Sequence, residues 1–154
     1  IKKVNDMRKI ECLSHKRWNK MWKLWKRKKL DTPLDELVTY YNAMCHGHLF
    51  YFKQFKGNSL EIIRQMWILK QYIPKEHYNN LIEAYELYNS IKDKVLTPFE
   101  EEEAFLKNDE KYFLDDYFLH LIIWDLLTYN PYIVKPFNER KALRIIQKNK
   151  SSKS

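Results

Sequence analysis

The chain has 154 residues, a net charge of +8 at pH 7, and only two glycines, Gly47 and Gly57. A single domain of this length can bury roughly 68–70% of the surface of its unfolded chain, and so few glycines disfavour phosphate-binding loops and tight β-hairpins. Two cysteines, Cys12 and Cys45, are too few for a disulfide framework and favour a reducing intracellular compartment.

The charge is divided along the chain. Residues 1–29 hold 12 Lys and Arg against two acids, residues 30–134 hold 9 against 17, and residues 135–154 hold 7 against one. Since there is no repeat and no low-complexity linker, we expect one domain over residues 1–154, with a basic N-terminal helix (1–29) and a basic C-terminal tail (135–154). Basic ends on an acidic body indicate an anionic partner for the ends, or association of the ends with the body.

Helical periodicity is present from the start of the chain. Between Asn5 and Lys29, apolar residues recur at spacings of three and four, and Lys and Arg occupy much of the remaining surface. A second helix is predicted from Pro33 to Lys56, with Thr32 as its cap and Gly57 after its end. A third helix is predicted from Leu60 to Tyr72, capped by Asn58 or Ser59, and a fourth from Lys75 to Val95.

Thr97-Pro98-Phe99-Glu100 has the pattern of a capping box with proline at the first helical position. It predicts a short helix from Pro98 to Leu106, which Asn108-Asp109 would end. A last helix is predicted from Glu139 to Lys148, after an extended stretch from Tyr132 to Phe137.

The segment Tyr112–Tyr129 reads YFLDDYFLHLIIWDLLTY. From Tyr117 onward it is apolar on nearly every side, which is typical of a buried helix, and at about 13 residues this run is shorter than the roughly 20 that span a bilayer. We therefore predict an all-α bundle of about six to seven helices with Tyr112–Tyr129 at its centre. Asp125, inside the run, must either find a polar partner or lie on the least buried side.

Three groups of residues could carry chemistry, and each has a simpler interpretation. Cys45 and His48 would share a helix face, but a zinc site needs four well-placed ligands, so packing is favoured. Glu100–Glu103 point in all directions, as in a solvated helix start. His120 lies one turn after Asp116, but no motif supplies a nucleophile. We expect no catalytic residue, no metal and no cofactor.

The strongest local signal is a basic segment interleaved with tryptophan, in which we name nine candidate partner-binding residues: Arg17, Lys20, Lys23, Lys26, Arg27, Lys28, Trp18, Trp22 and Trp25. Three interpretations stay open. The tryptophans could belong to the core, with the cations solvated; the helix could lie on anionic lipid; or it could bind RNA phosphates or an acidic protein surface.

The stretch YIPKEHY at residues 72–78, the aromatic amphipathic helix after it, and Phe113 and Phe118 before Trp124 resemble the Plasmodium helical interspersed (PHIST, RESA-type) domain of exported malaria proteins. The resemblance covers about Asp35 to Thr128. It implies a helical bundle that binds acidic tails or cytoskeletal proteins in the host red cell, without catalysis.

The sequence thus predicts a non-enzymatic helical module that binds an acidic protein surface through its basic N-terminal and C-terminal segments. The alternative is an accessory subunit of a large assembly, such as a mitochondrial ribosome or respiratory complex, that contacts RNA, neighbouring subunits or lipid headgroups. The corresponding compartments are a host cell that receives the exported protein, or the mitochondrion.

Overall fold

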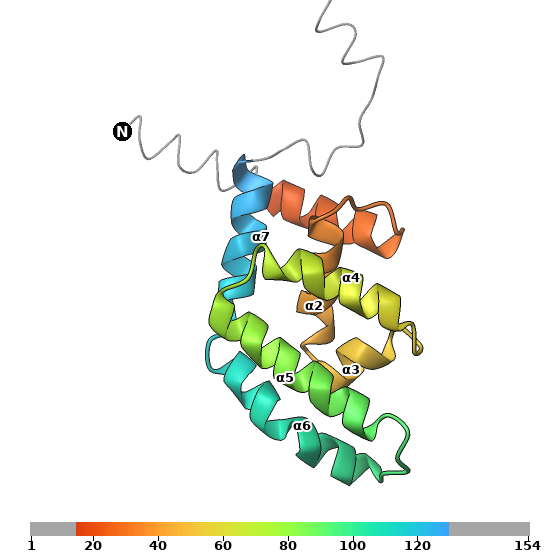
Figure 1. The fold of residues 1–154 in the computed structure, drawn as a ribbon. Coiled ribbons are helices and arrows are strands. Elements are labelled where there is room, and N and C mark those ends of the chain that lie inside the picture. Colours follow the sequence, from red (N-terminus) through yellow and green to blue (C-terminus); the bar gives the residue numbers. More distant parts are fainter. Residues whose placement is uncertain (1–14, 130–154) are drawn as a thin grey trace, which may run out of the picture.

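The computed structural model describes residues 15–129, and within them the chain is helical with no strand (Figure 1). The predicted all-α class is confirmed. The predicted segments 132–137 and 139–148 and the basic tail lie outside the described residues. The N-terminal helix is described over residues 15–26, and the further helices are α2 (Leu34–Ala43), α3 (His48–Lys53), α4 (Ser59–Lys70), α5 (Lys75–Ile91), α6 (Pro98–Phe113) and α7 (Tyr117–Tyr129).

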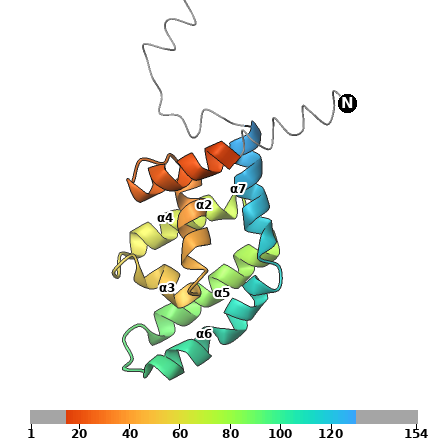
Figure 2. The same ribbon diagram turned by 180° about the vertical axis from the view of Figure 1, so that it is seen from behind.

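The helix at the centre of the described bundle is α2. Figures 1 and 2 both show α2 in the middle of the molecule, and six of its ten residues are buried, against four of the thirteen in α7. The prediction that Tyr112–Tyr129 forms one central helix was wrong, because α6 ends at Phe113 and the chain turns at residues 114–116. Among residues 15–129, neighbours cover only one side of α7, and Leu121 on the other side is 47% exposed.

The predicted helix from Pro33 to Lys56 is two helices. The first ends at Ala43 and the second begins at His48, with Gly47 between them at a φ of 99°. This left-handed backbone suits glycine and not the other residues. The corner is held from α6, where the Asp109 carboxylate accepts hydrogen bonds from the backbone N–H of His48 at 2.9 Å and from its ring Nδ1 at 2.7 Å.

The helix that was predicted to end at Leu106 continues to Phe113 as α6. Asn108 and Asp109 do not break it, because both side chains find partners on other helices. The Asn108 side chain donates to Asn80 Oδ1 on α5 at 2.9 Å, and the Asn80 side chain donates to the Asn108 carbonyl at 2.9 Å. Polar groups satisfied in this way can be buried at little cost.

Two of the three predicted helix caps are confirmed. Thr97 and Glu100 form the capping box of α6, and the Asn58 side chain accepts from the Glu61 N–H at the start of α4. Thr32 was wrongly predicted to cap the next helix, since no side chain caps α2. Its hydroxyl instead donates to the carboxylate of Glu36 at 2.8 Å.

Glu36 is a buried carboxylate that links α2 to α4. It is 1% exposed, and it also accepts from the Arg64 guanidinium at 2.8 Å. Removing the Arg64 side chain is expected to be destabilising, because the Glu36 charge would stay buried without its cation, whereas Arg64 itself is 45% exposed.

Replacing Gly47 with alanine tests the corner between α2 and α3. A Cβ at Gly47 would lie 2.5 Å from Asp109 Oδ2, whereas a Cβ at Gly57, whose φ is also positive, meets open space. We expect Gly47→Ala to lower the free energy of unfolding by about 2–4 kcal/mol and the control Gly57→Ala by about 1 kcal/mol. Urea denaturation measures both values, and equal losses would show that Asp109 does not constrain the corner.

Candidate functional site

The tryptophans of the N-terminal helix pack against the rest of the bundle. Trp18 and Trp22 are partly buried, and the Trp18 ring lies 6.1 Å from Tyr41 of α2 and 5.9 Å from Trp124 of α7. Between them in the sequence, Met21 is fully buried. These contacts are typical of packing at helical spacing.

Trp25 fixes the other end of this helix. It is partly buried, and its indole Nε1 donates to Thr39 Oγ1 on α2 at 2.9 Å. A buried indole usually finds such a partner. The three tryptophans named as candidate partner-binding residues therefore hold the helix on the bundle, and their positions favour the core interpretation over a docking stripe.

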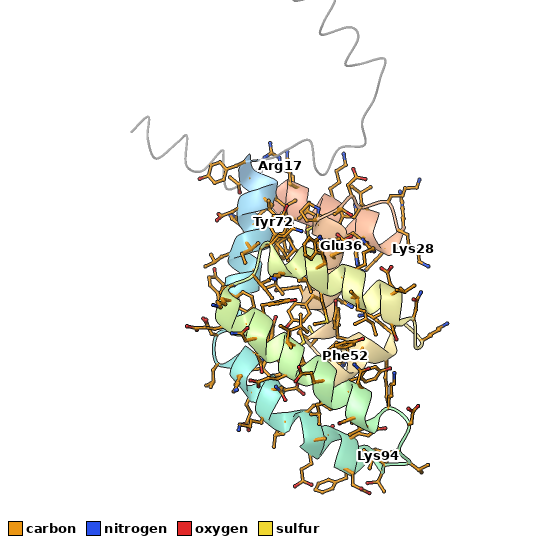
Figure 3. All side chains as sticks on the ribbon, in the orientation of Figure 1. Arg17, Lys28, Glu36, Phe52, Tyr72 and Lys94 are labelled. Atoms are coloured by element: carbon orange, nitrogen blue, oxygen red, sulfur yellow. The ribbon has the colours of Figure 1, made fainter. Side chains whose placement is uncertain are left out.

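Arg17 is engaged within the chain. Its Nη1 donates to the backbone carbonyls of Leu127 at 2.8 Å and Thr128 at 2.9 Å (Figure 3 shows Arg17 beside the last turn of α7). The last carbonyls of a helix lack partners within the helix and carry the negative end of its dipole. A cation placed there stabilises α7 and joins the N-terminal helix to it, so Arg17 is not free for a partner.

The other cations face solvent. We call them the basic face, which comprises Lys16, Lys20, Lys23, Lys26, Arg27, Lys28 and Lys29, all exposed. None of them forms an ion pair with a carboxylate of residues 15–129. No acid occurs between residues 15 and 29. The N-terminal helix and the three residues after it thus present seven positive charges without neutralisation from the described bundle, which raises the local potential for anions.

The cysteine and histidine candidates do not converge. The break at Gly47 separates Cys45, which is exposed, from His48, which is fully buried and bonded to Asp109. The prediction that Cys45 and His48 share a helix face was wrong for this reason. Within residues 15–129, no three His, Cys, Asp or Glu side chains are grouped so as to hold a metal ion, and Cys12 lies outside the described residues.

His120 lies beside a shallow cavity of about 230 Å³ that Cys45 and Asp116 also line. The described residues show no hydrogen bond from His120 to either one. Its ring stacks on Tyr117 at 5.1 Å and on Trp124 at 5.9 Å. Burial lowers the pKa of His120 below its usual value of 6.5. This arrangement has no nucleophile paired with a base.

Asp125 is exposed, so the second alternative given for it holds: it lies on the least buried side of α7. None of the helices in residues 15–129 has the length and apolar content needed to cross a membrane. Comparisons with protein-family models, curated proteins and solved structures return no match, and the PHIST resemblance therefore stays a prediction.

Replacing Arg17 with glutamine tests its contact with α7. We expect the free energy of unfolding to fall by about 1–3 kcal/mol, because two charge-assisted hydrogen bonds to the helix end are lost. The matched control is Lys20→Gln in the same helix, whose exposed side chain should change stability by at most about 0.5 kcal/mol. If both variants lose the same stability in urea denaturation, Arg17 does not hold the end of α7.

The lowered pKa of His120 predicts a pH dependence of stability. As the pH falls through 6.5, the unfolded state takes up a proton on His120 before the folded state does, so stability declines. His120→Phe keeps an aromatic ring but cannot titrate. We expect the melting temperature of the wild type to fall more than that of the variant between about pH 8 and about pH 5. Parallel pH profiles would contradict the assignment.

Proposed function

We propose that this chain is a non-enzymatic interaction module whose basic face binds an acidic protein surface. The observation that carries the proposal is the basic face itself, seven exposed cations without a carboxylate partner in the described bundle. A surface helix without a binding role commonly carries Glu three or four residues away from Lys, because such pairs attract one another and stabilise the helix. This helix carries none between residues 15 and 29.

The attachment of the N-terminal helix to the bundle supports a binding role. Trp18, Trp22 and Trp25 fix it against α2 and α7, and Arg17 ties it to the end of α7. A cationic surface that is ordered before binding loses less conformational entropy when a partner docks. The basic tail, residues 135–154, is proposed to add to the same electrostatic attraction, and the PHIST resemblance points to the same class of partner.

An acidic protein is favoured over RNA because the aromatic side chains of this helix are occupied. Single-stranded RNA is held by stacking of bases on exposed aromatic rings as well as by cations. The three tryptophans here pack on Tyr41, Thr39 and Trp124 instead. They are likewise turned toward the bundle, whereas a helix on lipid directs its apolar face to the membrane.

Neutralising the basic face tests the proposal. A labelled poly-glutamate peptide serves as the acidic probe for the variant in which Lys20, Lys23, Arg27 and Lys28 are changed to Gln. We expect binding about 10- to 30-fold weaker, since four exposed ion pairs contribute roughly 0.5 kcal/mol each. We also expect a flatter salt dependence. The fold should be unchanged in circular dichroism.

The matched control changes four exposed lysines outside the N-terminal helix, Lys56, Lys75, Lys92 and Lys107, to Gln. This control removes the same net charge. A loss of poly-glutamate binding that occurs only in the first variant therefore shows that the peptide binds the basic face. Equal binding by both variants and the wild type at physiological salt would refute the proposal. Tighter binding to oligouridylate, or to vesicles of phosphatidylserine and phosphatidylcholine, than to poly-glutamate would favour the accessory-subunit interpretation instead.

A further inference from the structure

The outer side of α6 carries a line of exposed apolar side chains. Phe99 is 70% exposed, Leu106 54% and Phe113 49%. They are seven residues apart, which is close to two helical turns and places them on one face. The core uses a different face of α6, through Phe105 and Tyr112. Packing in the core therefore does not explain why Phe99, Leu106 and Phe113 are apolar.

These three residues line a hollow on the surface of the bundle. Its volume is about 440 Å³, and its other lining residues are His46, Glu102, Glu103, Asp109 and Glu110. A second hollow of about 220 Å³ adjoins it, where Phe50 of α3, 44% exposed, faces the same helix. We call the two hollows together the α6 groove. At 1.5 Å per residue, it extends along about 20 Å of α6.

The groove is mainly acidic. One cation, Lys53, lines its second hollow, where it pairs with Glu101 at 3.0 Å. Helix α6 holds six acids against Lys107 and Lys111, and Lys111 turns to Glu83 on α5 at 3.5 Å. Glu102, Glu103 and Glu110 form no ion pair with any residue of 15–129. Apolar anchors in a row, with unpaired carboxylates beside them, are therefore presented together on one helix.

This combination specifies the chemistry of an occupant. The carboxylates of the groove would repel an acidic helix. A wholly apolar helix would remove water from these carboxylates without giving them a cation as a partner. A helix with apolar residues on one face and Lys or Arg beside them satisfies both features, in the mode by which amphipathic helices bind grooves. We propose that the α6 groove docks a basic amphipathic helix of a partner protein.

This site is separate from the basic face and goes beyond the function proposed above. Figures 1 and 2 both show the N-terminal helix and α6 at opposite ends of the described bundle. The two surfaces have opposite charge and select opposite partners. Binding of poly-glutamate to the basic face and binding of a basic helix to the α6 groove can therefore be measured independently, and the failure of one does not affect the other.

The test uses the full chain and two helical peptides. The first has leucines on one face and lysines beside them, and the second has glutamate in place of each lysine. We expect the leucine–lysine peptide to bind, and Leu106→Ser combined with Glu103→Lys to weaken that binding at least about tenfold, as expected when an anchor and a charge pair are both removed. Binding of the leucine–glutamate peptide, which the basic face can hold, should not be weakened by this variant.

The matched control is Leu60→Ser combined with Glu86→Lys, at exposed positions on α4 and α5 outside the groove. It should bind the leucine–lysine peptide as the wild type does. Circular dichroism and melting temperatures verify that both double variants fold. Equal peptide binding by the groove variant and the wild type would overturn the proposal, as would no binding by the wild type.

Two other occupants would give different results, and either would overturn the choice of a partner helix. A second copy in the groove would appear as wild-type dimers in sedimentation that the groove variant dissociates. If the basic tail of the chain occupies the groove, the wild type will not bind the leucine–lysine peptide. Changing Arg140, Lys141, Arg144 and Lys148 to Gln will then allow the peptide to bind.

Discussion

The arrangement of the described bundle depends on the carboxylate of Asp109. It accepts two hydrogen bonds from His48 and stands against Gly47, so it holds the corner between α2 and α3 on α6. His48 is fully buried, and its other ring nitrogen lies 3.4 Å from the Tyr40 hydroxyl. The corner thereby orients α2, and α2 supplies the surface on which the N-terminal helix and α7 pack. A buried polar network of this kind gives a fold a defined geometry when its members are satisfied.

The sequence predicted the parts of this fold that are set by neighbouring residues. Thr97 and Glu100 are three residues apart, and Asn58 lies just before its helix, so both caps could be read directly. The corner at Gly47 could not be predicted, because Asp109, which holds it, is 61 residues away from its hydrogen-bond partner His48. Asn108 and Asp109 were misread as a helix end for the same reason, since partners on other helices outweigh their local preference for turns.

The candidate site likewise has features that the sequence predicts and features that depend on residues far away in the chain. The cations and the helical spacing of the tryptophans were visible in the sequence, but the role of Arg17 depends on carbonyls 110 and 111 residues away. On α6, the seven-residue spacing of Leu106 and Phe113 could have been noticed. It was not informative alone, because Phe105 and Tyr112 have the same spacing and are buried. Only the packing of α6 on α5 and α3 distinguishes the two stripes.

The separation of charge between the two ends of the described bundle has an effect before any contact forms. The N-terminal helix and the residues that follow it carry eight cations from Lys16 to Lys29, while α6 at the opposite end has four more acids than cations. The described bundle therefore has a permanent electric dipole along its length. In the field of a charged surface it experiences a torque within a Debye length, about 8 Å at physiological salt. It would therefore arrive already oriented, with one end leading, and fewer encounters would be spent in unproductive orientations.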